Sequence, residues 1–427
     1  MARAGEQRRI GILAGGGSLP REIADSLRAR GLHAHIVAFR DEADADFSDF
    51  PITWVYWGQV GALVKAFKQA GCADIVIVGR VSRPDLGRLR PDFGFFAALA
   101  TVLRIVASGG DDSVLRSVTR FFEKKGFCIV GPGDVAPELL IGKGALGANM
   151  PTSDDEREIA HGLRLLEALS PFDVGQTVVL SDKLRVEAIE GIEGTDAMLA
   201  RVAERRRMDG RLTSPAHGFL IKAPKRGQDM RVDLPAIGPD TAKNASAANL
   251  KGLAVHAGHV LAADKKKLIA SADTHGVCVV GVAYEREAGV LGKPAVSSPC
   301  RLMPDGVEVL GNTRPSNKFL RDVQLGVQVL QSLTAYDTGG GVVVASGHVL
   351  GVETGEGIGA LCQRIAQRKQ WGAVRWRRRR GTVVVRNATD ITRDAIDEIS
   401  AAGFAGFAIV RPSACDADDV AQLADLD

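Results

Sequence analysis

The chain has 427 residues, 45% hydrophobic and 25% charged, an ordinary composition for a globular protein with several cores. Its 54 lysines and arginines nearly balance 51 aspartates and glutamates, and this balance argues against a general nucleic-acid-binding role. The first nine residues lack the apolar core of a signal peptide, and no apolar run is long enough to span a bilayer, so we expect a cytoplasmic protein. The six cysteines form no CxxC motif or Cys/His cluster, which disfavours a zinc site or a redox pair.

The first 145 residues alternate between strand-like and helix-like patterns. Apolar runs predict strands at 10–14, 35–39 and 74–78, and amphipathic patterns predict helices at 22–30 and 60–70. This alternation favours a Rossmann-like parallel sheet with helices on its faces. Ligands of such sheets bind beyond the carboxyl ends of the strands, so we interpret residues 1–145 as a nucleotide- or phosphate-binding domain.

The pattern changes near residue 146 and predicts a second α/β domain over residues 146–284. A helix is expected at 156–169, followed by two strands at 176–180 and 184–188 and by a helix that opens at 193–196. Residues 285–304 contain glycine, proline and serine and are interpreted as a linker.

Residues 305–427 repeat the pattern of residues 146–282. Leu146-Gly147, Gly162 and Gly175 recur at an offset of 164, Glu193-Gly194 at 163, and Gly252 at 154. We interpret the segment as a degenerate duplicate that keeps the fold but catalyses nothing. Charged residues of the first copy are replaced in the duplicate. At an offset of 163, Asp196 aligns with Gly359. When the offset of 154 is extended upstream, it aligns Asp229 with Val383, Arg231 with Val385, Asp233 with Asn387, and the segment 222–225 with 376–379.

Two loops at predicted strand ends are suited to phosphate. Gly15, Gly16, Gly17 and Ser18 lie between a strand and a helix, where backbone N–H groups and the helix N-terminus can hold an anion; a tight turn without a ligand is the alternative. The second loop, Gly79–Asp85, offers two guanidiniums and a hydroxyl, and its alternative is a surface loop with ion pairs. Its candidate contact residues are Gly79, Arg80, Val81 and Ser82.

Carboxylates occur at two further places. Asp111 and Asp112 precede a predicted helix and offer oxygen ligands to Mg²⁺, although helix capping explains Asp112 equally well. Asp229, Arg231 and Asp233 alternate with apolar residues, so on a strand all three would share one face and hold a metal or position a water. A structural ion-pair row is the alternative.

These motifs resemble, in sequence and in order, those of the LpxI-type UDP-2,3-diacylglucosamine pyrophosphatases over residues 8–284. The matching segments are Ile12–Pro20, Gly79–Asp85, Gly110–Asp112, Glu193–Met198, Lys222–Lys225 and Arg231–Pro235. One departure lies at 189–194, where Ile-Glu-Gly-Ile-Glu-Gly is longer than the family's usual segment; the other is the duplicate itself.

The resemblance implies hydrolysis of UDP-2,3-diacylglucosamine to UMP and 2,3-diacylglucosamine 1-phosphate in lipid A synthesis. Water would attack the α-phosphate with the assistance of Mg²⁺, and two domains would clasp the substrate. Asp233 lies in the motif that carries the family's essential aspartate and is our predicted catalytic residue. Predicted substrate contacts are the two glycine-containing loops with Thr195, Asp196, Lys222, Lys225 and Arg231, and predicted metal ligands are Asp111, Asp112 and Asp229.

The resemblance also implies a dimer, but the duplicate can occupy the partner's surface. We therefore expect either a homodimer or a monomer with an intramolecular pseudo-dimer, in peripheral contact with the inner-membrane surface and without a nucleic-acid partner. Two other functions stay open: a non-catalytic protein that binds a nucleotide sugar or lipid sugar, and a nucleotide-dependent oxidoreductase. The second is disfavoured because the chain lacks a GxGxxG fingerprint after its first strand.

Overall fold

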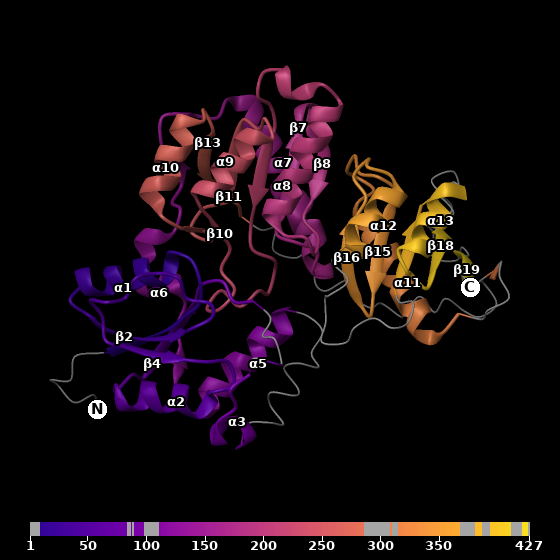
Figure 1. Ribbon diagram of the computed structural model, residues 1–427. Coiled ribbons are helices and arrows are strands. Elements are labelled where there is room, and N and C mark those ends of the chain that lie inside the picture. The colour runs from indigo at the N-terminus through magenta and orange to yellow at the C-terminus, as the bar shows by residue number, and fades with distance from the viewer. Residues whose placement is uncertain are drawn as a thin grey trace. The chain divides into compact units, whose positions relative to one another are not determined.

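The computed structural model describes residues 9–82, 87, 89–97, 111–285, 308–309, 315–367, 381–386, 393–410 and 421–425 (Figure 1). The chain divides into two compact units. The first unit comprises Met1–Ile141, Gly227–Pro239 and Gly258–Leu268, and the second comprises Gly142–Arg226, Asp240–Ala257 and Ile269–Asp427. Two segments that follow residue 146 in the sequence, 227–239 and 258–268, thus belong to the first unit.

The first unit contains a five-stranded sheet in the order β3-β2-β1-β4-β5, and every neighbouring pair is parallel. This is the order of the first five strands of a Rossmann sheet, which confirms the predicted Rossmann-like fold class. The strands are β1 (Arg9–Ala14), β2 (His33–Phe39), β3 (Ile52–Val55), β4 (Asp74–Val78) and β5 (Cys128–Ile129). The helices are α1 (Leu19–Ala29), α2 (Val60–Gln69), α3 (Phe93–Ala97), α5 (Asp111–Lys124) and α6 (Pro132–Val135).

Apolar side chains cover both faces of this sheet. Ile10 and Ile12 of β1 belong to one buried cluster with Ile23 and Leu27 of α1, whereas Leu13 of β1 belongs to a second cluster. Alternate residues of a strand point to opposite faces, so an almost continuous apolar run buries both sides of β1. The second cluster also contains Phe67 of α2 and Phe122 of α5.

The segments 227–239 and 258–268 add a small parallel sheet to the first unit. It consists of β10 (Ala236–Ile237) and β12 (Leu261–Ala262). Leu234 packs against the cluster that contains Ile12, and Val232 packs against the cluster that contains Leu13. The 227–239 segment is therefore anchored to the cores on both faces of the five-stranded sheet.

The second unit begins with a six-stranded mixed sheet in the order β6-β13-β11-β9-β7-β8. Its strands are β6 (Gly144–Ala145), β7 (Thr177–Ser181), β8 (Arg185–Ile189), β9 (Phe219–Lys222), β11 (Gly252–His256) and β13 (Cys278–Val282). β9, β11 and β13 are mutually parallel, whereas β7 runs antiparallel to β8 and β9. The helices are α7 (Ser153–Leu169), α8 (Thr195–Met208) and α9 (Pro239–Ala247), and α10 (Lys265–Thr274) precedes β13.

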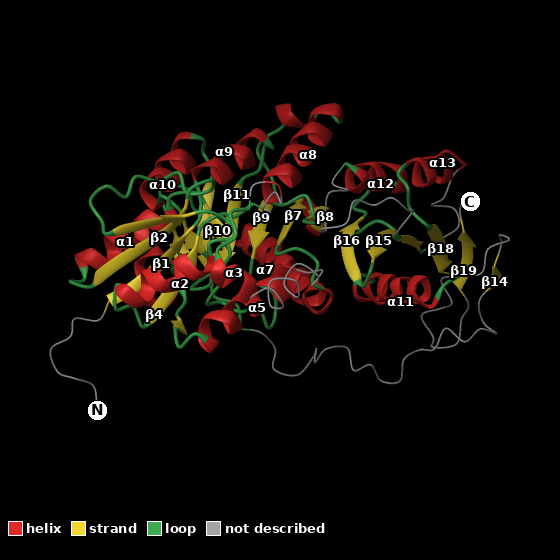
Figure 2. Ribbon diagram, turned by 60° about the horizontal axis from the view of Figure 1, so that its bottom comes forward, coloured by secondary structure: helices red, strands yellow, loops and turns green. Residues whose placement is uncertain are grey.

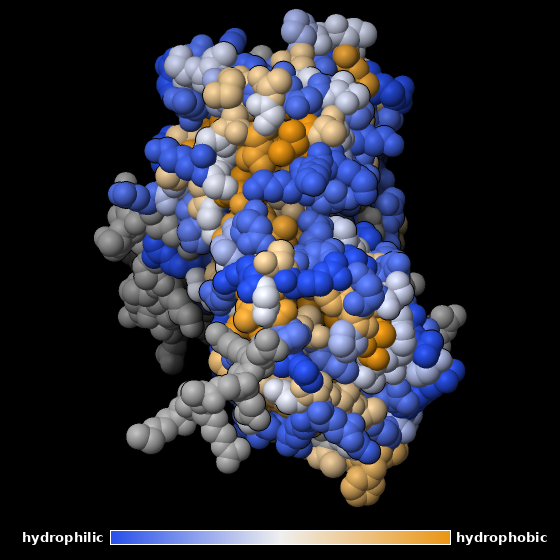
Figure 3. Space-filling model, turned by 90° about the vertical axis from the view of Figure 1, so that its left-hand side faces the viewer, coloured by the Kyte–Doolittle hydropathy of each residue, from blue (hydrophilic) through white to orange (hydrophobic). Residues whose placement is uncertain are grey.

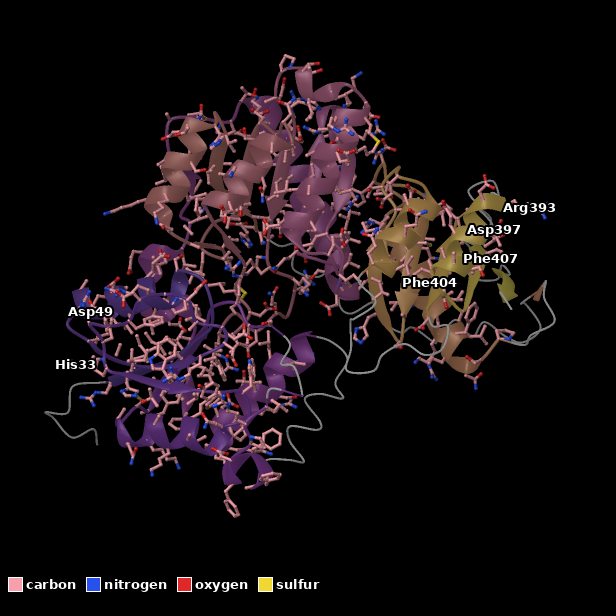
Figure 4. All side chains as sticks on the ribbon, in the orientation of Figure 1. His33, Asp49, Arg393, Asp397, Phe404 and Phe407 are labelled. Atoms are coloured by element: carbon pink, nitrogen blue, oxygen red, sulfur yellow. The ribbon has the colours of Figure 1, made fainter. Side chains whose placement is uncertain are left out.

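The duplicate forms its own six-stranded sheet in the order β14-β19-β18-β17-β15-β16. Figure 2 shows α11 over one face of this sheet and α12 and α13 over the other. Phe404 and Phe407 are buried in its core, whereas Arg393 and Asp397 are exposed on α13 (Figure 4). Its elements are β14 (Glu308–Val309), α11 (Asn317–Ser332), β15 (Gly341–Ala345), β16 (His348–Val352), α12 (Ile358–Ala366), β17 (Thr382–Val385), α13 (Arg393–Ala401), β18 (Gly406–Val410) and β19 (Ala421–Asp425).

The strand registers show how the two copies correspond. Val178 pairs with Ile189 and Val342 pairs with Val352, and both pairs of strands carry a bulge at the same place, between 179 and 180 and between 343 and 344. Thr177 pairs with Lys222, and its counterpart Gly341 pairs with Val385. Lys222 therefore corresponds to Val385 at an offset of 163.

This register corrects part of the alignment made from the sequence. The replacements that extended the offset of 154 upstream, Asp229 by Val383, Arg231 by Val385 and the segment 222–225 by 376–379, are wrong. Asn387 and residues 376–379 lie outside the described residues. The first copy has residues 223–238 between β9 and α9, whereas the second has only residues 386–392 between β17 and α13. The connection in the duplicate is therefore too short to contain a counterpart of the Asp229–Asp233 segment. The charged side chains of that segment are absent from the duplicate because the segment is deleted.

In the part of the chain that is described, no helix combines the length and apolarity needed to cross a membrane. On the face drawn in Figure 3, hydrophobic residues form small patches among hydrophilic ones.

Candidate functional site

Two glycine-containing loops meet beyond the carboxyl ends of β1 and β4 in the first unit. The backbones of Gly16 and Arg80 form an antiparallel bridge, with N···O distances of 2.8 Å in both directions. A Cβ added at Gly15 would lie 2.3 Å from the carbonyl oxygen of Arg80, and one at Gly79 would lie 2.7 Å from the carbonyl carbon of Gly15. Glycine at these positions is therefore required for the close approach of the two loops.

The backbone amides of Gly15, Gly16 and Gly17 already have partners. The N–H of Gly15 donates to the carbonyl of Val78 at 2.9 Å, and the N–H of Gly17 donates to Oδ1 of Asp44 at 2.6 Å. The Asp44 carboxylate thus occupies the place of an anionic ligand at Gly17. A phosphate bound through Gly17 would have to displace Asp44, a competition that the sequence did not reveal.

A second carboxylate, Glu42, organises the loop that follows β4. It accepts hydrogen bonds from the backbone N–H of Ser82 at 3.0 Å, from the Ser82 hydroxyl at 2.7 Å and from the Trp57 indole at 3.2 Å. Burial raises the pKa of Glu42, but the hydrogen bonds from Ser82 and Trp57 outweigh this effect, so the net pKa lies below its usual value. Arg80 and Val81 are exposed beside this ionised group, and Arg83–Asp85 lie outside the described residues.

The segment Asp229–Asp233 is a turn in the structure, and the prediction of a strand there is wrong. The N–H groups of Val232 and Asp233 both donate to the carbonyl of Asp229, at 3.0 and 2.9 Å. Arg231 folds back on Asp229 with a bidentate ion pair of 2.9 and 2.8 Å, which is the main reason that the pKa of Asp229 is lowered. The Arg231 guanidinium also contacts Glu123 of α5 at 3.2 Å.

This turn lies at the same sheet edge as the two glycine-containing loops. Gly131 follows β5, and a Cβ added there would lie 3.3 Å from the carbonyl of Met230 and 3.4 Å from Cα of Arg231. The side chains of Val232 and Leu234 enter the cores on opposite faces of the sheet, which leaves the half-buried Asp233 between them. The carbonyl of Asp233 accepts a bond of 2.7 Å from Nε2 of Gln228.

The described residues contain no cluster of three or more His, Cys, Asp or Glu side chains that could hold a metal. Both Asp229 oxygens are bonded to Arg231, so a metal ion at Asp229 would have to displace this ion pair. Asp111 and Asp112 begin α5, but their side chains lie outside what is described. Mg²⁺ often uses only one or two carboxylates together with substrate phosphates, so Asp233 with a bound diphosphate would still suit it.

A buried polar cluster lies at the carboxyl end of β9 in the second unit. Lys222 is 6% exposed, and its ammonium donates to Oγ1 of Thr195 at 3.0 Å; this hydroxyl donates to Oε1 of Glu190 at 2.7 Å. Oε2 of Glu190 accepts the backbone N–H of Gln176 at 3.0 Å. Lys222 and Thr195 were predicted as contacts, whereas Glu190 was missed because it stands outside the Glu193–Met198 motif.

Two neighbouring predicted residues have side-chain partners of their own. Asp196, in the first turn of α8, accepts a hydrogen bond of 3.2 Å from Asn244 of α9. Lys225 forms an ion pair with Asp173, 44% exposed, just after α7 and its short continuation. The structure thus brings Asp196 beside the Lys222–Thr195 cluster through α8, but holds Lys225 against Asp173.

The duplicate fills the equivalent space with apolar side chains. Ile358 stands at the position of Thr195 and Val385 at that of Lys222, and both belong to a buried cluster. A Cβ on Gly341, the counterpart of Thr177, would lie 2.1 Å from Cδ1 of Ile358, so Ile358 occupies this space. Glu353 replaces Glu190 but accepts the backbone N–H of Gly357 at 2.9 Å.

The protein is of the two-domain α/β class. Its first sheet has Rossmann strand order and a glycine-rich loop, and its second α/β unit carries a buried lysine at the carboxyl end of β9. A family model described as the LpxI N-terminal domain matches residues 9–139, and one described as the LpxI C-terminal domain matches residues 142–280 and again 306–401. The chain therefore belongs to the LpxI family. The double match confirms that the C-terminal domain is duplicated.

A curated relative from Caulobacter vibrioides is named UDP-2,3-diacylglucosamine pyrophosphatase LpxI. It is 39% identical over 280 residues, which cover 64% of this chain and 98% of the relative.

Proposed function

We propose that the chain hydrolyses UDP-2,3-diacylglucosamine to UMP and 2,3-diacylglucosamine 1-phosphate, a step of lipid A synthesis. The observation that carries this proposal is the Asp229–Asp233 turn, which holds a carboxylate at the same sheet edge as two glycine-containing loops. The name of the relative supports the substrate, because this chain covers 98% of that protein.

In the proposed reaction the oxygen of water forms a bond to the α-phosphorus. The bond between this phosphorus and the bridging oxygen breaks, and the bridging oxygen leaves with the β-phosphate as the sugar 1-phosphate. Asp233 orients the water and accepts its proton, which is work suited to a positioned carboxylate. We propose that Arg80 and Arg231 offset charge on the phosphates and that Arg231 exchanges Asp229 or Glu123 for substrate.

Mg²⁺ is part of the proposal. When bound, it would neutralise charge that develops on the diphosphate, and Asp233 is the carboxylate proposed to hold it, with Asp229 as a second after release of Arg231. We expect EDTA to abolish UMP release and Mg²⁺ to restore it. Full activity in EDTA, with the absence of metal checked by elemental analysis, would remove Mg²⁺ from the mechanism.

The central experiment is hydrolysis of the substrate in ¹⁸O-labelled water. Attack at the α-phosphate places the label in UMP and leaves the sugar 1-phosphate unlabelled, as measured by mass spectrometry. Label in the sugar phosphate would contradict the site of attack. Binding of the substrate without release of UMP would instead favour a non-catalytic lipid-sugar-binding protein.

The proposal extends to the surroundings of the enzyme. We propose that it acts in the cytoplasm and meets its diacyl substrate at the inner-membrane surface. A vesicle sedimentation assay with and without the substrate lipid tests this contact. A homodimer and a monomer with an internal pseudo-dimer both agree with a hydrolase of this kind.

A further inference from the structure

The two copies of the C-terminal domain meet within the second unit through a cluster of four charged side chains. Arg201 contacts Glu193 at 3.2 Å and Glu356 at 3.3 Å, and Arg364 contacts Glu193 at 2.8 Å and Glu356 at 2.5 Å. We call these residues the Arg–Glu quartet. Each arginine therefore binds the glutamate of its own copy and that of the other copy.

The quartet is symmetric in sequence as well as in space. Glu193 corresponds to Glu356 and Arg201 to Arg364, both at the offset of 163 that the strand registers establish for this part. Each glutamate precedes an equivalent glycine before its helix, Gly194 with φ 81° and Gly357 with φ 87°. Contacts in which equivalent residues exchange places are the signature of a two-fold, isologous interface between like subunits.

The quartet is shielded from water and is surrounded by further contacts between the copies. The side chains of Glu193 and Glu356 are 3% and 9% exposed, and burial together with the adjacent Arg364 guanidinium lowers the pKa of Arg201. The N–H of Ile192 donates to the carbonyl of Leu350 at 3.2 Å. Arg205 donates to the carbonyls of Thr354 and Gly355 at 2.8 and 2.9 Å.

An apolar core also joins the copies. A single buried cluster contains Leu163 and Leu166 of α7 together with Val329 and Leu330 of α11, the helix that corresponds to α7. The ring of His161 lies 5.1 Å from that of Tyr336. The surface that the second copy covers is thus apolar beside the helices and charged at the quartet, and it is complementary to a second copy of the same domain.

Glu193 of the quartet lies close in the chain to the candidate substrate site of the first copy. Glu193 is separated from Thr195 only by Gly194, and Thr195 receives the hydrogen bond from Lys222. The N–H of Met198 donates to the carbonyl of Gly194 at 3.1 Å, so the position of this turn sets the start of α8. Arg364 is the residue of the second copy that holds Glu193.

We infer that the second copy serves the first as a built-in partner subunit, and that its Arg364 is a positioning residue for the turn that begins α8. The catalytic part of this inference rests on the proposed function. The structural part does not, because it concerns only how the second copy holds the Glu193–Thr195 turn.

The test compares Arg364→Ala with the full-length wild type. Arg207→Ala is the matched control, because Arg207 lies on α8 and pairs with Glu204 at an exposed position, with side chains 62% and 50% exposed. Loss of a hydrogen-bonded charge is worth about a factor of ten in an equilibrium. The amides of Gly194 and Met198, which are hydrogen-bonded at this turn, should therefore exchange hydrogen about tenfold faster in Arg364→Ala and be unchanged in Arg207→Ala. Unchanged exchange, or an equal increase throughout the second unit, would overturn the positioning role.

The same variants are assayed for UMP release. We expect Arg364→Ala to raise KM about tenfold with kcat within about twofold, and Arg364→Lys to recover part of the loss. Faster local exchange with unchanged KM and kcat would overturn the link to the substrate site. An inactive wild type with the expected exchange pattern would instead count against the proposed function and leave the built-in partner standing.

Light scattering tests whether the surface is used within one chain. The wild type is expected at 45.2 kDa, the mass of a monomer. A wild-type dimer that persists in the double variant Arg201→Ala/Arg364→Ala also agrees with the inference, because such a dimer must form through a surface other than the one that contains the quartet. A wild-type dimer that this double substitution dissociates would overturn the inference.

Discussion

Asp233 and Lys222 show how single residues acquire a role from their backbone setting. Asp233 is half-buried at the end of a turn whose flanking apolar residues enter two cores, so packing holds the backbone that carries its carboxylate. Lys222 ends a buried strand and is 6% exposed, with Thr195 as its hydrogen-bond partner. Gly16 is a poorer probe of ligand binding, because a Cβ there would lie 2.7 Å from the carbonyl of Glu42 and would disturb the fold.

Asp233→Asn should lower kcat by about 10²–10⁴-fold, because an amide cannot accept the proton of the attacking water. The melting temperature should stay within a few degrees of the wild type. Asp49→Asn is the control, since Asp49 is an exposed partner of Arg21 and Arg28 on the first unit (Figure 4). Near-normal turnover of Asp233→Asn would exclude Asp233 from the chemistry.

Lys222→Met should reduce kcat/KM by about 10- to 100-fold, the effect of losing one charged hydrogen bond. The methionine keeps an unbranched side chain that is one atom shorter, and it removes the positive charge beside Thr195. Lys267→Met, at a lysine whose side chain is 77% exposed, controls for loss of a surface charge. If both variants retain wild-type kinetics, Lys222 is only a structural residue.

At the scale of elements, a buried arginine ties α8 to its surroundings. Nε of Arg206 donates to Glu187 of β8 at 2.8 Å, and Nη1 donates to the carbonyls of Ala248 and Asn249 at 3.0 and 2.8 Å. Arg211 is a second partner of Glu187. The side chain of Arg206 therefore connects α8 to β8 and to the end of α9.

Glu187→Gln should lower the free energy of unfolding by about 3–5 kcal/mol near pH 7, because it leaves the Arg206 charge buried without its counterion. Burial raises the pKa of Glu187, but the attraction of Arg206 and Arg211 outweighs it, so the net pKa lies below its usual value of 4.5. The stabilisation is therefore present above about pH 4.5 and is lost as the pH falls through the folded-state pKa. Urea unfolding should show the gap between wild type and variant closing in acid; a gap independent of pH would contradict this account.

At the scale of the molecule, the duplicate differs from the first copy mainly by what it lacks. The first copy sends two segments, 227–239 and 258–268, into the first unit. The second copy has a shorter connection between β17 and α13, and its last strand β19 runs antiparallel to β18 where β13 runs parallel to β11. It keeps the face that meets the first copy, as the Arg–Glu quartet shows.

A chain that ends at residue 304 should associate with itself through the uncovered surface. In such a pair Arg201 would contact Glu193 of the other chain in place of Glu356. We expect about twice the monomer mass by light scattering, and Arg201→Glu should restore the monomer by repelling that glutamate. A stable, well-folded monomer at high concentration would show that this surface has no need of a partner.

The sequence by itself determined the local elements, the duplication and the family. Apolar runs and glycines after helices depend only on neighbouring residues, so strand β4 and the end of α1 before Gly31, with φ 70°, were predictable. Only the tertiary structure decided the turn at Asp229–Asp233, because Arg231 folds back on Asp229 and packing of Val232 and Leu234 overrides strand-like alternation. The same holds for the competition of Asp44 at Gly17 and for the contacts of the Arg–Glu quartet that join the two copies. Gly17 and Asp44 are 27 residues apart along the chain and Glu193 and Arg364 are 171 residues apart, and such pairs leave no local signal.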